Sequence, residues 1–203
     1  MEDALLVDAG TGNLQSVYNA LTTLGYAIRI TSDPADLGRS GRIILPGVGA
    51  FGNFMNGISS LGLSEAIQSA ARRGDPLLCI CVGMQALFEV GEELGQAPGL
   101  GLLPGRVVRF PEMPGLKVPH TGWNQVAPTC PIPLYKNLRP GNFVYFNHSY
   151  YCAPADSADI AGTTEYGIFF ASMVQHENCY GVQFHPEKSQ QVGLQMLKNF
   201  MEL

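Results

Sequence analysis

Two short segments carry side chains whose types and spacing suit chemistry. The first, CICVGMQ, occupies residues 79–85, and the second, HPE, occupies residues 185–187. Together they supply a thiol, an imidazole and a carboxylate, which are the nucleophile, the base and the orienting group of cysteine-based acyl transfer. The sequence therefore predicts an acyl-transfer site built from Cys81, His185 and Glu187.

Cys81 follows a short apolar run and precedes a helical pattern, which predicts a sharp turn between a strand and a helix. Such a turn holds a side chain exposed, and the backbone N–H of Val82 would face the oxyanion formed when the sulfur attacks. The alternative is a core cysteine, since cysteine is among the residues most often buried. This segment alone leaves both interpretations open.

The HPE segment favours the catalytic interpretation. Pro186 favours an extended backbone at His185, and residues i and i+2 of an extended chain face the same side. Glu187 is therefore placed to orient the His185 ring, which can take a proton from Cys81 and pass it to a leaving amine. The alternative is a surface histidine beside a solvated glutamate at a strand end.

Three further segments are candidates for binding. PGVG, at residues 46–49, follows a strand-like run, and its glycines can present backbone N–H groups to an oxygen; the alternative is a simple turn. Ser149 lacks the strand–turn–helix pattern of a serine nucleophile, so we expect backbone or hydroxyl contacts from it. Trp123 lies between a glycine and an asparagine; burial is its default, and a partner surface is the alternative.

Composition narrows the class of protein. The chain has 203 residues, a net charge of −5 and 12 scattered Lys and Arg residues, which suits one α/β domain and argues against nucleic-acid binding. Its apolar runs are far shorter than the ~18 residues that cross a bilayer. Residues 1–3 are acidic and do not resemble a signal peptide. We expect a cytoplasmic protein that binds neither nucleic acid nor membranes.

The five cysteines do not indicate a disulfide framework, because their number is odd and no secretion signal precedes them. A zinc site would need a second ligand pair beside Cys79 and Cys81. Cys130, Cys152 and Cys179 show no close spacing to one another or to a histidine. We therefore expect no metal site.

The elements that must position these residues differ between the two halves of the chain. In the first half, apolar runs alternate with helical patterns, which favours a mostly parallel sheet covered on both faces. The expected strands there are residues 4–7, 27–31, 42–45 and 76–80, and the expected helices are residues 14–24, 64–73 (capped by Ser64) and 84–90. The second half is expected to contain strands at residues 102–110, 124–127, 142–151, 168–175 and 179–184, a hairpin turn at residues 176–178 and a helix from about residue 189.

We therefore expect one α/β domain over residues 1–203, with a mixed, mostly parallel central sheet flanked by helices. Sites in such sheets lie beyond the carboxyl ends of the strands. Both the loop at residues 8–13 and Cys81 fall there.

The motifs resemble those of a known family. CVGMQ at residues 81–85 and HPE are similar to the motifs shared by class I glutamine amidotransferases of the Cys-His-Glu type. GNLQSV at residues 12–17, GWN at 122–124 and HSYY at 148–151 narrow the resemblance to the glutaminase subunits of imidazole glycerol phosphate synthases. The resemblance covers essentially the whole chain.

The resemblance implies a reaction and its residues. Cys81 would attack the side-chain amide carbon of L-glutamine, releasing ammonia and leaving a γ-glutamyl thioester that water hydrolyses to glutamate. His185 would move the protons, Glu187 would orient it, and no cofactor would take part. The implied oxyanion and substrate contacts are Val82, Pro46, Gly47, Val48, Gly49, Gln85, Glu93, His148, Ser149 and Tyr150.

The resemblance also implies a heterodimer with a TIM-barrel cyclase. That partner would use the ammonia to make imidazole glycerol phosphate and aminoimidazole carboxamide ribotide in histidine biosynthesis. Trp123 and residues 8–13, with Asn13, would lie toward the partner, and the glutaminase would be slow until the partner is docked and occupied. The alternatives are a glutaminase for another synthase (of aminobenzoate, GMP or pyridoxal phosphate) and a catalytically silent subunit, the last disfavoured by the intact triad.

The chain departs from the family pattern at a few positions. Cys79 stands where glycine is usual, two residues before the nucleophile, and Ala9 stands where tyrosine is usual. Thr121 and Asn147 replace more typical apolar residues. These departures bear on partner affinity and on packing near the turn, since each reacting group is retained.

Overall fold

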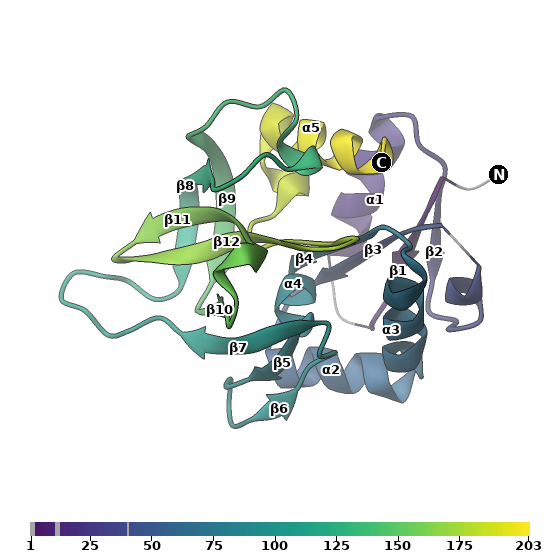
Figure 1. Ribbon diagram of the computed structural model, residues 1–203, viewed down its shortest axis with the longest axis horizontal. Helices are drawn as coiled ribbons and strands as arrows, with labels where there is room; N and C mark the ends of the chain where they lie inside the picture. Colours follow the sequence, from purple (N-terminus) through teal and green to yellow (C-terminus); the bar gives the residue numbers. More distant parts are fainter. Residues whose placement is uncertain (1–2, 11–12, 40) are drawn as a thin grey trace.

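The computed structural model describes residues 3–10, 13–39 and 41–203, and Figure 1 traces its elements. Its N-terminal part is a run of parallel strands in the order β2-β1-β3-β4-β13. Most of these strands are buried along nearly their whole length, as strands covered on both faces must be. They are β1 (Ala4–Val7), β2 (Ile28–Thr31), β3 (Arg42–Gly47), β4 (Leu77–Cys81) and β13 (Cys179–Val182).

Helices cover both faces of this parallel region. Figure 1 shows α1 (Leu14–Thr23) and α5 (Gln190–Met201) on one side, and α2 (Phe51–Ser60) and α3 (Leu63–Arg73) on the other. Each helix buries one apolar side, as Phe51, Phe54 and Ile58 of α2 illustrate. This arrangement confirms the predicted α/β class with a mixed sheet flanked by helices. Within the described stretches, no helix combines the length and apolar character needed to cross a membrane.

The second half of the chain extends the sheet with mostly antiparallel strands. The order continues β13-β12-β10-β7-β5-β6, while β11 joins β12 to β8 and β8 pairs with β9. The predicted hairpin at residues 176–178 is confirmed, because His176 of β12 pairs with Cys179 of β13. The strands are β5 (Phe88–Gly91), β6 (Ala97–Pro98), β7 (Leu103–Arg109), β8 (His120–Pro128), β9 (Asn142–His148), β10 (Tyr150–Pro154), β11 (Ile160–Tyr166) and β12 (Ile168–His176).

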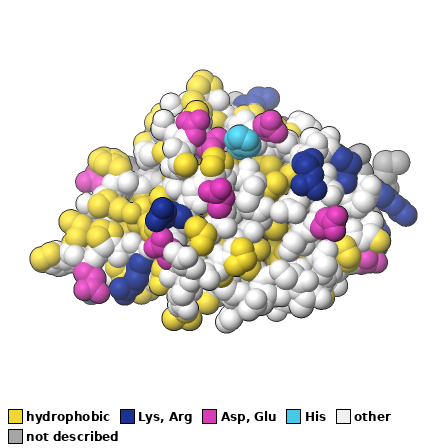
Figure 2. Space-filling model, turned by 60° about the horizontal axis from the view of Figure 1, so that its bottom comes forward, with side chains coloured by type: hydrophobic (Ala, Val, Ile, Leu, Met, Phe, Trp, Pro, Cys, Tyr) yellow, Lys and Arg dark blue, Asp and Glu magenta, His cyan; other side chains and the backbone are white. Residues whose placement is uncertain are grey.

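Short 3₁₀ turns complete the fold, at Asp36–Gly38, Pro133–Tyr135, Ser157–Asp159 and Pro186–Lys188. At the end of the sheet where β11 turns into β12, the apolar side chain of Phe169 is 72% exposed. Figure 2 shows hydrophobic side chains gathered toward that end of the molecule.

The predicted helix at residues 84–90 is wrong in its extent. The helix α4 covers Val82–Ala86 only, and the chain then enters β5. The carbonyl oxygens of Ala86 and Leu87 accept hydrogen bonds from the backbone of Leu100 and Leu102, which lie far along the chain. Because these long-range bonds replace the next turn of helix, local spacing alone does not reveal where α4 ends.

The predicted strand at residues 142–151 is two strands separated at Ser149. His148 pairs with His120 of β8, whereas Tyr150 pairs with Arg109 of β7. The chain therefore changes partner at Ser149, whose carbonyl accepts a hydrogen bond from Phe110. β11 was not predicted, because its sequence IAGTTEY is largely polar and its pairing with β12 is irregular.

The predicted cap at Ser64 is also wrong. Helix α3 begins at Leu63 after Gly62, which has φ 69° and lies in the left-handed region that glycine tolerates. The Ser64 hydroxyl instead lies 3.4 Å from the Ser59 hydroxyl.

The turn between β4 and α4 is a tight junction. Cys81 has φ 56° and ψ −111°, an unusual conformation for a residue with a side chain. Gly83 follows it against β3, where a Cβ on Gly83 would collide with the carbonyl oxygen of Leu45. The close approach of α4 to β3 thus requires glycine and holds Cys81 in its strained turn.

This contact predicts the effect of a methyl group at Gly83. The Gly83→Ala variant should lose about 2 to 3 kcal/mol of unfolding free energy, because β3 and α4 must separate to admit the Cβ. Gly38→Ala is the matched control, since a Cβ there meets nothing within 4 Å, and it should stay within about 0.5 kcal/mol of the parent. Urea denaturation measures both. Equal stability of the two variants would contradict the proposed packing.

Candidate active site

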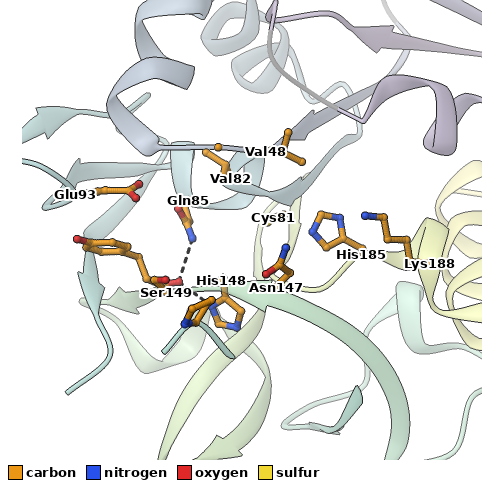
Figure 3. Close-up of a pocket in the computed structure, with 13 residues that line it drawn as sticks. Val48, Cys81, Val82, Gln85, Glu93, Asn147, His148, Ser149, His185 and Lys188 are labelled. Atoms are coloured by element: carbon orange, nitrogen blue, oxygen red, sulfur yellow. Dashed lines mark hydrogen bonds between the residues drawn. The ribbon is translucent and has the colours of Figure 1, made fainter. Parts of the chain in front are cut away.

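A cavity of about 290 Å³ opens where β4 ends and where the chain passes from β9 to β10. Figure 3 shows Val48 and Val82 on one side of it, Ser149 and His148 on the opposite side, and His185 beside Cys81. Its lining residues come from segments far apart in the sequence. They are Val48, Gly49, Cys81, Val82, Gln85, Glu93, Pro119, Asn147, His148, Ser149, Tyr150, His185 and Lys188.

Cys81, His185 and Glu187 form one connected group. Nδ1 of His185 lies 2.9 Å from Oε1 of Glu187, and both side chains are almost fully buried. Cys81 forms a side-chain hydrogen bond with His185 and is 3% exposed. Cys81 and His185 line the cavity, whereas Glu187 does not and contacts Nδ1 of the ring.

The charge state of His185 follows from these partners. Burial alone lowers the pKa of His185, but the hydrogen bonds and negative charges of Cys81 and Glu187 outweigh it and raise this pKa from 6.5 to about 10. His185 is therefore an imidazolium at neutral pH. Its hydrogen bond to the Cys81 side chain places a proton donor beside a nucleophile.

The backbone of His185 is tied to strand β9. Its N–H donates to the carbonyl of Tyr145 at 2.9 Å, and its own carbonyl accepts from the buried Ser189 hydroxyl at 2.6 Å. The Ser189 hydroxyl also accepts from the Tyr145 N–H at 3.0 Å. These three hydrogen bonds fix the backbone position of His185, so that its ring can contact both Cys81 and Glu187.

Two glutamines support the other side of Cys81. Gln85, predicted as a substrate contact, donates to the carbonyl of Tyr150 and to Oε1 of Gln183, each at 3.1 Å. Gln183 is fully buried, and its Nε2 lies 3.8 Å from the Cys81 sulfur. Gln85 lines the cavity, and its amide also bridges α4, β10 and the segment after β13.

The predicted oxyanion and substrate segment at residues 46–49 divides into two parts. Val48 and Gly49 line the cavity, whereas Pro46 and Gly47 belong to β3 and do not line it. Gly47 pairs with Cys81 and packs against Gly83, so its place is structural. Val82 lines the cavity at the first residue of α4.

The remaining predicted contacts lie around the cavity mouth. Glu93 accepts a hydrogen bond from the N–H of Phe51 at 2.7 Å and keeps its carboxylate at the lining. His148, Ser149 and Tyr150 form the opposite wall through the change of strand partner at Ser149.

The two predicted partner residues lie outside the cavity lining. Trp123 is 47% exposed, and its ring lies 6.1 Å from that of Tyr145. Asn13 precedes α1 and accepts a hydrogen bond from the Ser16 hydroxyl at 2.8 Å. Residues 11 and 12 of the predicted loop at residues 8–13 lie outside the described residues.

Sequence reasoning missed four residues of the site. Gln183 and Lys188 lie in the same GVQFHPEKS segment as the base, and Asn147 adjoins the HSY motif, so their motifs were the available signal. Pro119 had no comparable signal.

Cys79 is a free, fully buried thiol in β4, paired with Leu45 and Gly181. Over the part of the chain that the structure describes, no group of three or more metal-ligating side chains is arranged to hold a metal ion.

The contacts of His185 with Cys81 and Glu187 predict how its pKa responds to the loss of each partner. Cys81→Ala removes a hydrogen bond and a charge that raise this pKa, so it should fall well below the parent value of about 10. Glu187→Gln should lower the pKa for the same reason. Nitrogen-15 NMR titration of the imidazoles measures both, with the His176 signal as internal control. A Cys81→Ala protein whose His185 stays protonated at high pH would contradict the pairing.

Comparisons with known proteins agree with this geometry. The family model for class I glutamine amidotransferases matches residues 5–203. The chain is 50% identical to imidazole glycerol phosphate synthase subunit HisH of Moorella thermoacetica, over 100% of this chain and 96% of that protein. It is 45% identical to the protein of the same name from Syntrophotalea carbinolica, over 98% of this chain and 99% of the relative.

Solved structures show the same fold at lower identity. A putative GMP synthase subunit protein from Thermoplasma acidophilum aligns with a TM-score of 0.72 at 20% identity, over 100% of this chain and 93% of that one. PurLQS from Thermotoga maritima aligns with a TM-score of 0.73 at 18% identity, over 98% and 97%. Because the family model spans nearly the whole sequence and curated relatives are about half identical, the chain belongs to the class I glutamine amidotransferase family.

Proposed function

We propose that the chain is the glutaminase subunit of an imidazole glycerol phosphate synthase. It hydrolyses L-glutamine and delivers the ammonia to a cyclase subunit in histidine biosynthesis. The observation that carries the proposal is the buried Cys81–His185–Glu187 group at the wall of a cavity. The names of the relatives from Moorella thermoacetica and Syntrophotalea carbinolica support the choice of synthase.

The chemistry follows from the protonated His185 beside the Cys81 sulfur. The Cys81 sulfur attacks the side-chain amide carbon of glutamine, and the N–H of Val82 is positioned to donate to the oxyanion. The His185 imidazolium gives its proton to the departing nitrogen, so ammonia leaves and a γ-glutamyl thioester remains. His185, now neutral, takes a proton from water as the water attacks the thioester. Glutamate leaves, and the proton on His185 restores the starting pair.

The cavity suits the polar end of glutamine. The Glu93 carboxylate lies at the lining, where it can pair with an α-ammonium group. Ser149 and Tyr150 line the opposite wall. Gln85 holds that wall through the Tyr150 carbonyl. Val48 and Gly49, beside Val82, provide a second source of backbone donors.

A partner docked at Trp123 would be connected to His185 through a single residue, Tyr145. Trp123 and Phe143, which is 53% exposed, border a surface cavity with Gln190 and Val192. Trp123 also touches Tyr145, whose carbonyl accepts the hydrogen bond of the His185 N–H. We propose that the cyclase subunit covers this face, with Asn13 at its edge, and that docking raises the glutaminase rate through Tyr145.

The nucleophile is tested by two cysteine variants of the complex. With the cyclase and its ribonucleotide ligand present, Cys81→Ala should lower ammonia release from glutamine more than about a thousandfold, since the thioester no longer forms. Cys79→Ala is the matched control, because Cys79 is buried two residues earlier in the same strand, and it should stay within about threefold of the parent. Loss of activity in Cys79→Ala with retention in Cys81→Ala would reverse the assignment.

The docking face is tested by two exposed aromatic residues. Trp123→Ala should weaken binding of the cyclase about tenfold to a hundredfold, as expected for an aromatic anchor at an interface. Phe169→Ala is the control, because Phe169 is also exposed but borders a different cavity; its affinity should match the parent. Isothermal titration calorimetry with purified cyclase measures both. Equal affinities for the two variants would place the interface elsewhere.

A further inference from the structure

Two buried histidines outside the triad lie in an aromatic enclosure. His120 is 3% exposed and His148 is 6% exposed. The ring of His120 is stacked between Phe146 and Tyr166, at centroid distances of 4.7 and 3.9 Å. Burial of an imidazole among aromatic rings is costly unless its nitrogens are hydrogen-bonded. Both nitrogens of both rings have such partners, which form one chain.

The direction of donation along this hydrogen-bonded chain is set at the Tyr150 carbonyl. A carbonyl only accepts, so Nδ1 of His148, 2.8 Å from the Tyr150 carbonyl, must carry the proton. Nε2 of a neutral His148 then accepts from Nδ1 of His120, at 3.1 Å. Nε2 of His120 is left as an acceptor.

At the other end of the hydrogen-bonded chain, Asn124 independently gives the same direction of donation. The amide nitrogen of Asn124 lies 3.3 Å from Nε2 of His120 and also donates to the carbonyl of Glu165 at 2.9 Å. The amide oxygen of Asn124 accepts from the N–H of Gln125 at 2.8 Å. These two backbone bonds set which way the amide points, so Asn124 donates to His120. Both ends therefore require both rings to be neutral.

The enclosure keeps the rings neutral. Burial lowers the pKa of His120 to about 4. Burial, with the nearby His120 and His185, lowers the pKa of His148 to about 3 against the opposing effect of the Tyr150 carbonyl. Neither ring carries a charge that would reverse a donor in the chain at neutral pH.

The chain meets the active site at the carbonyl of Tyr150. The same oxygen accepts from Nε2 of Gln85 at 3.1 Å. Gln85 also donates to Gln183, whose amide approaches the Cys81 sulfur. His148 and Tyr150 line the cavity, whereas His120 does not. The side chain of His120 thus reaches the site through its hydrogen bond with His148.

We propose that His120 is a positioning residue for glutamine binding. It holds His148 in the tautomer that donates to the Tyr150 carbonyl, and so fixes the backbone of residues 148–150 against the polar end of the substrate. Asn124, which sets the direction, is next to Trp123 on β8. The inference rests on the proposed function, because it assigns that wall of the cavity to glutamine.

Kinetics of the enzyme–cyclase complex test the role of His120. His120→Phe keeps a ring between Phe146 and Tyr166 but removes the donor to His148. The KM for glutamine should rise about tenfold, with kcat within about threefold, because ground-state and transition-state binding weaken together. His120→Asn should restore KM to within about threefold, since its amide nitrogen can occupy the place of Nδ1.

Controls separate positioning from general damage to the fold. Tyr166→Phe keeps the stacking and loses only the hydroxyl bond to the Lys117 carbonyl, so its KM should match the parent. The rate at which iodoacetamide alkylates Cys81 should be the same in His120→Phe and the parent, because the triad is untouched. A parent-like KM in His120→Phe, or equal KM values in His120→Phe and His120→Asn, would overturn the proposal.

Nitrogen-15 NMR of the parent chain in its complex gives a readout independent of activity and of variant folding. His148 should be the Nδ1–H tautomer and neutral at pH 7, and His120 the same; an Nε2–H tautomer or a protonated ring at His148 would overturn the proposal. If the parent complex released no ammonia from glutamine, the proposed function would fail. The tautomers of His120 and His148 would still show whether the hydrogen bonds from Asn124 to Tyr150 run in the proposed direction. If the parent were active and the tautomers reversed, only the role of His120 would fall.

Discussion

The contact of α4 with the Leu45 carbonyl is the constraint on which the site depends. A Cβ at Gly83 has no room there, and the chain turns sharply just before it, at Cys81, which has φ 56°. A conformation of this kind costs about 1 to 3 kcal/mol and persists only where packing enforces it. Here β3 and β4 enforce it from one side, and Gln183 and His185 meet the sulfur from the other. The nucleophile is thus positioned by backbone packing, and the side chains that contact it come from the C-terminal part of the chain.

Much of this was predictable because the relevant signals are local. The apolar runs of β1, β3 and β4 are continuous, as strands buried on both faces must be, and each was found within one or two residues. The contact of Glu187 with His185 was predicted and forms, although only His185 is extended and Pro186–Lys188 is a 3₁₀ turn. The turn at Cys81 followed from an apolar run, a glycine and a helical pattern in immediate succession.

The rest depends on contacts between distant residues. Helix α4 ends at Ala86 because the N–H of Leu100 donates a hydrogen bond to the Ala86 carbonyl. No feature of residues 82–90 predicts that hydrogen bond. The break at Ser149 arises because His148 and Tyr150 pair with different strands. Gln183 and the hydrogen-bonded chain from Asn124 to Tyr150 connect three strands, the segment after β13 and helix α4, so their partners are set only when the sheet is assembled. Polar contacts between residues far apart in the sequence are the part of the site that sequence patterns predict least well.

The most direct test of the central claim is the location of the covalent intermediate. The complex with the cyclase would be mixed with glutamine, quenched with acid within a turnover, digested and sequenced by tandem mass spectrometry. The account predicts a γ-glutamyl group on Cys81 that disappears when the glutamine is exhausted. The same group on Cys79 or Cys130, or its absence while ammonia is being released, would contradict it.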